Sequence, residues 1–191
     1  MVSSVFCGLY CSTVMVEQYN PQKTLETIQA KKVSVLFTAP TAYRAMTGMV
    51  KSYDISSLKK CVSAGETLPL TTWQGWYNAT GIKIIDGLGS TEMLHIFVAT
   101  AGDDIKPGAT GKAIPGYQAK VFDDDGKECP PGTVGRLAVK GPTGVRYMSN
   151  PERQKAYSQN GWNCTGNAYK MDEDGDFIYQ ARTDDMIISA G

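Results

Sequence analysis

The chain has 191 residues, of which 42% are hydrophobic and 20% charged, a composition typical of a globular protein that buries a core. Nineteen basic residues balance nineteen acidic ones, and the sequence holds no basic cluster with interleaved aromatic residues. This balance argues against a nucleic acid or an anionic membrane as the partner.

The five cysteines, at positions 7, 11, 61, 129 and 164, are an odd and scattered set. Cys7 and Cys11 have no second pair and no histidine near them in the sequence, which favours buried thiols in a reducing cytosol over a zinc site. The apolar start, residues 1–16, lacks a basic leader region and is too short to span a bilayer. We therefore expect a cytoplasmic protein, and a domain that begins before Met1.

Helical and strand patterns alternate over the first hundred residues, which favours an α/β layer. Pro21 opens a helical pattern with Leu25 and Ile28 on one face. The expected elements are a helix from Pro21 to about Lys31, a strand over 33–38, a helix over 40–51, a strand at 61–62, a helix that carries Trp73 and Trp76, and strands over 82–85 and 96–98.

Three polar loops, residues 39–41, 63–66 and 86–92, follow successive strands of this predicted layer. In open α/β sheets, ligands bind at the carboxyl ends of the strands. We therefore expect the ligand site at these loops.

From about residue 106, Pro-Gly, Asp-Gly and Gly-Pro pairs separate short apolar runs, a pattern typical of a β-meander. The expected elements are strands over 117–122, 134–139, 177–179 and 186–189, and one helix over 150–157. The acidic runs 123–126 and 172–176 do not have the spacing of an EF-hand loop, so we interpret both as hairpin turns. The predicted fold class is α/β, with a layered sheet-and-helix portion over 1–105 and a small, barrel-like β-rich portion over 106–191.

The stretch Asp86–Phe97 combines two glycines, two hydroxyls, two acids and the single histidine of the chain. Gly87 and Gly89 would let the backbone approach a ligand or adopt positive φ, and amides in such a turn can bind an anion. Glu92 is a suitable Mg²⁺ ligand. These residues indicate a phosphate and magnesium site, and the alternative is a tight turn between two buried strands with a surface glutamate.

Six short motifs follow one another along the chain: Ser63–Glu66, Gly89–Glu92, Gly135–Gly141, Asn150–Glu152, Gly161–Asn167 and Arg182–Ser189. In this order they resemble the AMP-binding, adenylate-forming family, which includes acyl-CoA ligases, luciferases and the adenylation domains of peptide synthetases. Within that family, the segments 86–97, 109–116 and 141–144 look most like the benzoate and 2-aminobenzoate CoA ligases.

The resemblance implies a nucleotide site. Thr91 would hydrogen-bond the α-phosphate and Glu92 would hold Mg²⁺, so these two are the predicted catalytic residues. The backbone around the adenine would come from two segments: Ala64, Gly65 and Glu66, and Asp86, Gly87, Leu88 and Gly89. Asn167 and Arg182 would contact the ribose, although the family usually has Asp at position 167, which weakens this contact because Asn offers a single acceptor oxygen. Asp184 would be the hinge to a C-terminal lid.

The resemblance also places an acyl pocket near Tyr43 and His95. For Tyr43 the alternative is an ordinary aromatic on a buried helix face. For His95 the alternative is a core histidine whose hydrogen bonds are satisfied. The residues themselves leave these alternatives open.

The implied activity is that of an ATP-dependent acyl- or aryl-CoA ligase, with ATP or AMP, Mg²⁺ and coenzyme A as cofactors and co-substrates. The partners are then small molecules, with no nucleic acid and no membrane, and a homodimer of the parent protein is left open. The family's phosphate-gripping loop and lid lysine do not occur in this sequence, so we expect a fragment of the large N-terminal domain, inactive alone. The alternative is a non-catalytic nucleotide-binding remnant or interaction module.

Overall fold

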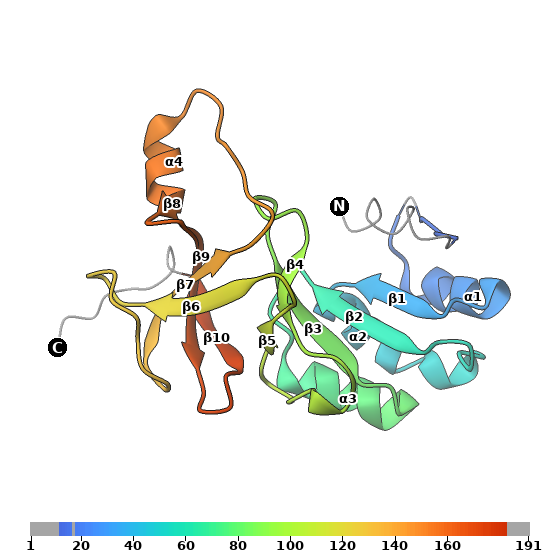
Figure 1. Ribbon diagram of the computed structural model, residues 1–191. Coiled ribbons are helices and arrows are strands. Elements are labelled where there is room, and N and C mark those ends of the chain that lie inside the picture. The colour runs from blue at the N-terminus through green and yellow to red at the C-terminus, as the bar shows by residue number, and fades with distance from the viewer. Residues whose placement is uncertain (1–11, 17, 183–191) are drawn as a thin grey trace. The chain divides into compact units, whose positions relative to one another are not determined.

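The computed structural model describes residues 12–16 and 18–182, and the chain divides into two compact units, residues 1–84 and 85–191 (Figure 1). The predicted strand over 186–189 and the cysteines Cys7 and Cys11 lie outside the described residues. Cys61 and Cys129 are buried thiols, and Cys164 is half-buried. No helix in the described part of the chain is long and apolar enough to cross a membrane.

The first unit alternates helices with strands, as the sequence predicts. Its two strands are parallel, with Val35 opposite Lys60 and Thr38 opposite Ser63. The elements are α1 (Pro21–Lys31), β1 (Val35–Thr38), α2 (Pro40–Thr47), the 3₁₀ helix η2 (Val50–Ser52), β2 (Lys60–Ala64) and α3 (Leu70–Thr80). The predicted helix over 40–51 therefore ends earlier and continues as a 3₁₀ turn.

Local capping sets the bounds of α1. The side chain of Asn20 accepts a hydrogen bond from the backbone N–H of Lys23 at 2.9 Å, and Pro21 occupies the first turn, where its missing N–H costs nothing. The helix ends at Lys32, whose φ of 51° is left-handed. Leu25 and Ile28 are the buried residues of the helix, as their spacing predicts.

The core of the first unit forms between α2 and α3. The rings of Tyr43 and Trp76 meet edge to face with centroids 5.0 Å apart, and neither side chain is exposed. The hydroxyl of Tyr43 lies 3.1 Å from the carbonyl oxygens of both Leu36 and Val62, so it joins α2 to the two parallel strands. On α3, the indole N–H of Trp73 donates to the carbonyl of Ile84 at 2.9 Å.

The second unit is rich in antiparallel strands, which confirms the predicted change of pattern. Pairing runs β3–β4–β5 in one sheet and β10–β9–β7–β6 in another, where β8 also pairs with β9. The elements are β3 (Ile84–Gly89), β4 (Ile96–Ala99), η3 (Gly102–Asp104), β5 (Lys112–Ala113), β6 (Gln118–Phe122), β7 (Val134–Lys140), α4 (Pro151–Tyr157), β8 (Ser158–Gln159), β9 (Trp162–Met171) and β10 (Phe177–Arg182).

A buried apolar cluster joins the strands of the second unit. Phe97 and Val98 of β4, Leu137 of β7 and Tyr169 of β9 belong to it, and Leu88 of β3 packs against it. Two features differ from the prediction. The predicted strand over 82–85 is shifted, so that Asp86–Gly89 lies within β3 and is not a turn. The ten-residue strand β9 is absent from the predicted elements. The division of the large domain near residue 105 stays a prediction.

We predict that Tyr43→Phe lowers the free energy of unfolding by about 1–2 kcal/mol, because one buried and one partly buried carbonyl oxygen lose their shared hydroxyl partner. Tyr77→Phe, which removes a hydroxyl from a side chain at the surface of α3, is the matched control and should change stability by less than about 0.5 kcal/mol. Urea denaturation of the two variants measures both effects. Equal stabilities would contradict the core role of Tyr43.

Candidate active site

The segment Asp86–Phe97 forms a strand, a tight turn and a second strand. The turn contains two successive backbone hydrogen bonds, from Met93 N–H to Ser90 O at 3.2 Å and from Leu94 N–H to Thr91 O at 3.3 Å. Met93 is fully buried in the apolar cluster and anchors the turn. Thr91 is exposed and Glu92 is half-buried, so the turn presents a hydroxyl and a carboxylate side by side.

The two glycines of this segment are explained by strand packing. A Cβ atom at Gly87 would lie 2.4 Å from Cδ1 of Ile96, and one at Gly89 would lie 2.6 Å from the carbonyl oxygen of His95. Neither glycine has positive φ. The expectation that they let the backbone adopt positive φ is therefore wrong, and the close approach that requires them here is that of β4 to β3.

The carboxylate of Glu92 is held by two side chains from a distant part of the chain. The hydroxyl of Tyr147 donates to Glu92 Oε1 at 2.8 Å, and Arg153 Nη2 lies 3.7 Å from the same oxygen. Partial burial raises the pKa of Glu92, but the hydrogen bond from Tyr147 and the charge of Arg153 outweigh it, and the net pKa lies below its ordinary value. Glu92 is thus ionised at neutral pH, and its oxygens suit a hard cation such as Mg²⁺.

Tyr147 and Arg153 are functional candidates that the sequence interpretation missed. The guanidinium of Arg153 stacks over the ring of Tyr147 at 4.2 Å, and the ring of Tyr157 packs edge to face against Tyr147 at 5.7 Å. Gln154 of α4 accepts a hydrogen bond from the backbone N–H of Tyr147 at 2.8 Å. The helix α4, which begins after the capping side chain of Asn150, therefore positions both groups that hold Glu92.

Asp86 lies on β3 in a partly buried position. Burial raises the pKa of Asp86 from its ordinary value of 3.8 to about 6, against the opposing effect of hydrogen bonds from Thr110 and from the backbone of Gly87. The hydroxyl of Thr110 also lies 3.4 Å from that of Tyr169. Asp86 is thereby linked through Thr110 to β9.

The two predicted ribose-binding residues face each other in one hairpin. Asn167 of β9 and Arg182 of β10 are opposite partners in the antiparallel register. The side-chain amide of Asn167 donates to the carbonyl of Thr165 at 3.2 Å, and Arg182 is exposed. Tyr169, which contacts Thr110, lies two residues from Asn167 on the same strand. The predicted residues Asp86, Thr91, Glu92, Asn167 and Arg182 thus all belong to the second unit.

His95 is exposed at the end of the turn. Its Nε2 lies 3.3 Å from the hydroxyl of Tyr117, and its Nδ1 lies against the carbonyl oxygen of Ile96. The Tyr117 hydroxyl also pairs with Thr143 at 2.7 Å, and Thr143 donates to Met93 O at 2.9 Å. This chain of hydrogen bonds fixes the orientation of the imidazole at the surface. The exposed position does not fit the alternative of a core histidine.

The remaining predicted residues belong to the first unit. Ala64 ends β2, and Gly65 follows it with φ of 93°. Glu66 is exposed and accepts a hydrogen bond from the hydroxyl of Thr41 at 3.4 Å. Tyr43 is a core residue in this structure, which favours the buried helix-face alternative, and its acyl-pocket role stays a prediction. Asp184, the predicted hinge, lies outside the described residues.

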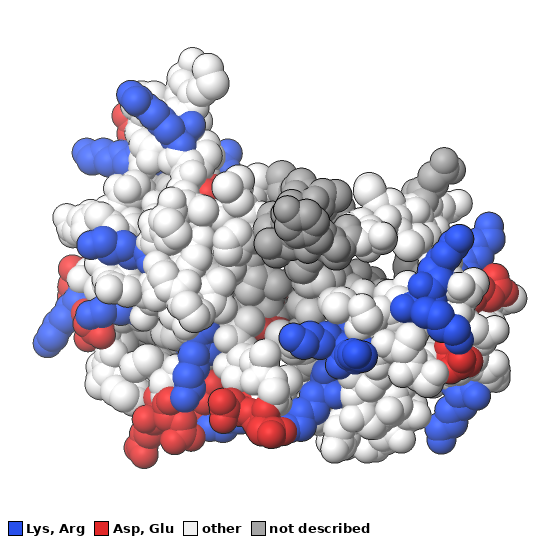
Figure 2. Space-filling view, turned by 45° about the vertical axis from the view of Figure 1, so that its right-hand side comes forward, with Lys and Arg blue, Asp and Glu red and all other residues white. Residues whose placement is uncertain are grey.

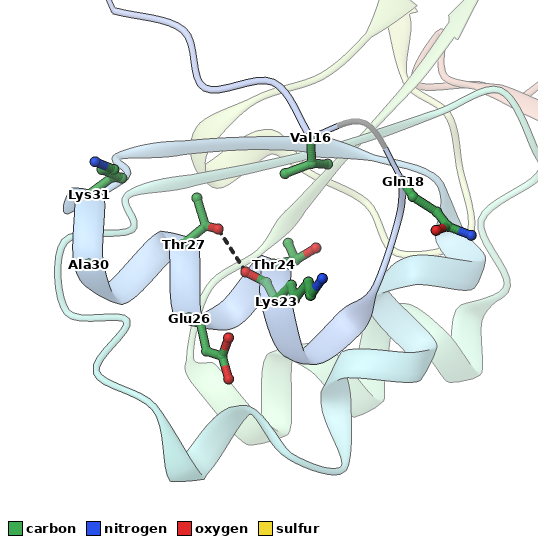
Figure 3. Close-up of a pocket in the computed structure, with 8 residues that line it drawn as sticks. All are labelled: Val16, Gln18, Lys23, Thr24, Glu26, Thr27, Ala30 and Lys31. Atoms are coloured by element: carbon green, nitrogen blue, oxygen red, sulfur yellow. Dashed lines mark hydrogen bonds between the residues drawn. The ribbon is translucent and has the colours of Figure 1, made fainter.

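A surface pocket in the first unit is lined by residues of the N-terminal segment and of α1 (Figure 3). Val16 and Gln18 of the N-terminal segment lie over one side of α1, and Thr27 points toward the pocket from that helix. The Thr27 hydroxyl donates to the carbonyl of Lys23 at 2.7 Å, so it satisfies the backbone of its own helix. None of the predicted site residues lines this pocket.

Comparison with known proteins agrees with the motifs. The family model described as AMP-binding enzyme matches residues 1–147. The benzoate–CoA ligase of Thauera aromatica is 34% identical over 185 residues, covering 94% of this chain and 35% of that protein. The human mitochondrial acyl-coenzyme A synthetase ACSM3 is 35% identical over 200 residues, covering 99% of this chain and 34% of that protein.

Solved structures show the same relationship. The anthranilate CoA ligase AuaEII in complex with anthranoyl-AMP matches with a TM-score of 0.88 and 38% identity, covering 93% of this chain and 35% of that one. A benzoate CoA ligase from Burkholderia xenovorans LB400 matches with a TM-score of 0.84 and 31% identity, covering 93% and 37%. The chain belongs to the AMP-binding enzyme family of adenylate-forming ligases, and it spans about a third of the length of these relatives.

We predict that Gly89→Ala destabilises the chain more than Gly87→Ala does. The added methyl group meets a backbone carbonyl at position 89, whereas at position 87 it meets the side chain of Ile96. Unfolding free energies of both variants test this order. Ile96→Val, which removes the Cδ1 atom nearest to position 87, should partly rescue Gly87→Ala and leave Gly89→Ala unrescued. If both alanine variants keep wild-type stability but lose nucleotide affinity, the glycines serve a ligand and the packing explanation fails.

We predict that Asp86 makes stability depend on pH between about 4 and 6. Because the folded-state pKa is raised to about 6, the unfolded chain loses this proton first as the pH rises, and the stability conferred by the protonated carboxyl is lost. The free energy of unfolding of the wild type relative to Asp86→Asn should therefore fall across this range, by no more than about 3 kcal/mol, and stay constant above it.

Urea titrations of the wild type and Asp86→Asn at several pH values measure this difference. Asp125→Asn, at an exposed position in the turn after β6, is the matched control and should follow the wild type at every pH. If the free energies of unfolding of the wild type and Asp86→Asn instead change in parallel with pH, burial does not perturb the pKa of the Asp86 carboxyl.

Proposed function

We propose that this chain forms part of an ATP-dependent aryl- or acyl-CoA ligase that activates a carboxylic acid as its adenylate and then transfers the acyl group to coenzyme A. The observation that carries the proposal is the turn at residues 90–95, which presents the Thr91 hydroxyl beside an ionised Glu92 carboxylate. Asn167 and Arg182, opposite each other in the same unit, supply polar groups for a ribose.

Each residue has a role that its chemistry supports. The exposed hydroxyl of Thr91 donates to the α-phosphate as the substrate carboxylate attacks it. Glu92 would hold Mg²⁺, which would supply positive charge to the nucleotide phosphates. Tyr147 and Arg153 are positioning residues, because they touch Glu92 and not the reacting atoms. Their contacts keep the Glu92 carboxylate ionised and fix its orientation.

In the second unit, the backbone of residues 86–89 contacts the nucleotide, and Asn167 and Arg182 contact its ribose. The adenine-binding role of residues 64–66 of the first unit stays a prediction. Because Asn167 stands where the family usually has a carboxylate, it offers one acceptor oxygen where Asp offers two, and the ribose contact is correspondingly weaker. Asp184 acts as the hinge to a lid domain. Coenzyme A is the second substrate, and the protein works in the cytoplasm.

The substrate class is an aromatic acid such as benzoate or 2-aminobenzoate. Two kinds of observation support this class. The relatives described above include benzoate and anthranilate CoA ligases. The exposed imidazole of His95 is oriented by Tyr117 and follows directly on the turn that carries Thr91 and Glu92, so it offers a polar edge beside the reacting centre. His95 is therefore the proposed acyl-pocket residue with the strongest geometric support.

The test is ATP–pyrophosphate exchange, measured on the longer protein that contains this chain, with benzoate, 2-aminobenzoate and hexanoate as acids. Glu92→Gln should lower the rate at limiting Mg²⁺ by at least about tenfold, since a neutral amide is a poor Mg²⁺ ligand. Excess Mg²⁺ should restore only part of the lost exchange rate.

Glu128→Gln is the matched control, because Glu128 is an exposed glutamate whose partner is Lys120. It should exchange pyrophosphate at the wild-type rate. An unchanged rate for Glu92→Gln at limiting Mg²⁺ would reject the metal assignment. Absence of exchange with all three acids in the wild type would reject the proposed function.

A further inference from the structure

The turn between β9 and β10 carries three aspartates, Asp172, Asp174 and Asp176. The hairpin prediction for this acidic run is confirmed, since Asp172 N–H donates to Asp176 O at 3.0 Å and Gly175 N–H donates to Asp172 O at 3.1 Å. Figure 1 shows the turn at the lower end of β9 and β10, and Figure 2 shows acidic side chains gathered beside basic ones along the lower side of that view.

The three carboxylates converge on one point. One oxygen from each lies within 4.8 Å of the other two. A calcium ion binds oxygen ligands at about 2.3–2.6 Å, so ligands on different sides of the ion stand up to about 5 Å apart. The observed separations therefore fit a single ion among the three carboxylates without a change of backbone.

Asp176 is the feature that a simple turn does not explain. Its side chain is 4% exposed, and its Oδ1 is buried without a hydrogen-bond partner. A buried carboxylate oxygen without a partner is costly, and native proteins satisfy such atoms with water, an ion or a ligand.

Lys106 already places a cation beside the cluster. Its Nζ lies 2.5 Å from Asp172 Oδ2 and 3.1 Å from Asp174 Oδ2. One ammonium group faces three carboxylates, and its two ion pairs leave Asp176 Oδ1 unsatisfied. Because the Lys106 side chain is 46% exposed, it can leave the cluster for solvent when a stronger cation arrives.

We propose that Asp172, Asp174 and Asp176 form a calcium site, in which Ca²⁺ replaces the Lys106 ammonium and coordinates the buried oxygen of Asp176. Calcium suits this cluster better than Mg²⁺, because Ca²⁺ accepts irregular oxygen ligation whereas Mg²⁺ requires a near-octahedral arrangement. The site is separate from the proposed Mg²⁺ ligand Glu92 and does not depend on the proposed function.

The other acidic turn of the chain, at residues 123–126, shows why three aspartates alone do not form a cation site. In the turn after β6, Asp123 Oδ1 already accepts a hydrogen bond from the N–H of Lys127 at 2.8 Å. The side chain of Asp124 is 98% exposed. Asp172 Oδ1 likewise accepts hydrogen bonds from the N–H groups of Asp174 and Asp176, so the difference between the two turns is the buried, unpartnered oxygen of Asp176. No such oxygen occurs among the described residues of the turn after β6, which therefore provides a matched control.

Calcium at this turn would cross-link the end of the hairpin that carries Asn167 and Arg182. The loop that begins at Lys106 also joins β10, because Thr110 N–H donates to Phe177 O at 2.9 Å and Phe177 N–H donates to Gly111 O at 2.7 Å. The expected consequence of the ion is therefore a more stable second unit.

Calorimetric titration of the purified chain with CaCl₂ tests the proposal. We expect one ion per chain with a dissociation constant below about 1 mM, and a melting temperature that rises with Ca²⁺. Asp176→Asn should weaken binding by at least about tenfold and abolish the thermal shift. Lys106→Met should strengthen binding, since it removes the competing ammonium. The double substitution Asp124→Asn and Asp125→Asn, and separately Glu92→Gln, should bind as the wild type does.

Asp176→Asn should remain folded without calcium, because it removes a buried carboxylate that lacks a partner. Its far-ultraviolet circular dichroism checks this point. No calcium-dependent heat up to about 10 mM, tenfold above the weakest dissociation constant expected, would overturn the proposal. Equal affinities for the wild type and Asp176→Asn, or weaker binding by Lys106→Met, would also overturn it.

Discussion

The close approach of β4 to β3 is the constraint on which the candidate active site depends. Two positions of β3 have no room for a Cβ atom, and one of them faces the backbone of the turn itself. The turn at residues 90–95 is therefore fixed in place by the paired strands β3 and β4 and by the buried side chain of Met93. Its outer side carries Thr91 and Glu92. Rigid packing on the inner side thus fixes the polar groups on the outer side, which is what phosphate chemistry requires.

Electrostatics then distinguishes the two carboxyl groups of this segment. Asp86 lies partly buried on β3, where its pKa is raised to about 6, whereas Glu92 is held below its ordinary pKa by Tyr147 and Arg153. The difference follows from the balance of burial and partners: burial of Asp86 outweighs its hydrogen bonds from Thr110 and Gly87, whereas at Glu92 the hydrogen bond from Tyr147 and the charge of Arg153 outweigh burial. Glu92 is consequently the carboxylate suited to a metal ion, and Asp86 is suited to a neutral hydrogen-bonding role that joins β3 to Thr110.

Much of the fold is predictable from the sequence because its signals are local. Pro21 with Leu25 and Ile28, and Asn150 with Pro151, give helix starts that the structure confirms. The shift of β3 onto Gly87 and Gly89 was not predictable, since glycine is depleted in strands and both positions read as a turn. Strand β9 was missed for a similar reason: after Trp162 its first half is made of small, mostly polar residues and a glycine, which do not read as a strand.

The residues of the candidate site likewise divide into those that a local motif predicts and those that only the fold brings together. Thr91 and Glu92 could be proposed from one contiguous motif, whereas Tyr147 lies 55 positions from Glu92 in the sequence, and no spacing rule connects them. The unsatisfied oxygen of Asp176 is likewise visible only when burial is known, because the acidic run has the composition of an ordinary turn.

A crystal structure of the longer protein with a non-hydrolysable 2-aminobenzoyl-adenylate analogue would show whether the segment 86–95, with Asn167 and Arg182, binds an acyl-adenylate. We expect the Thr91 hydroxyl within hydrogen-bond distance of the phosphoryl group, Arg182 at the ribose and His95 beside the aromatic ring. An analogue bound away from these residues, or bound in the pocket beside α1, would show that this segment is not the adenylate site.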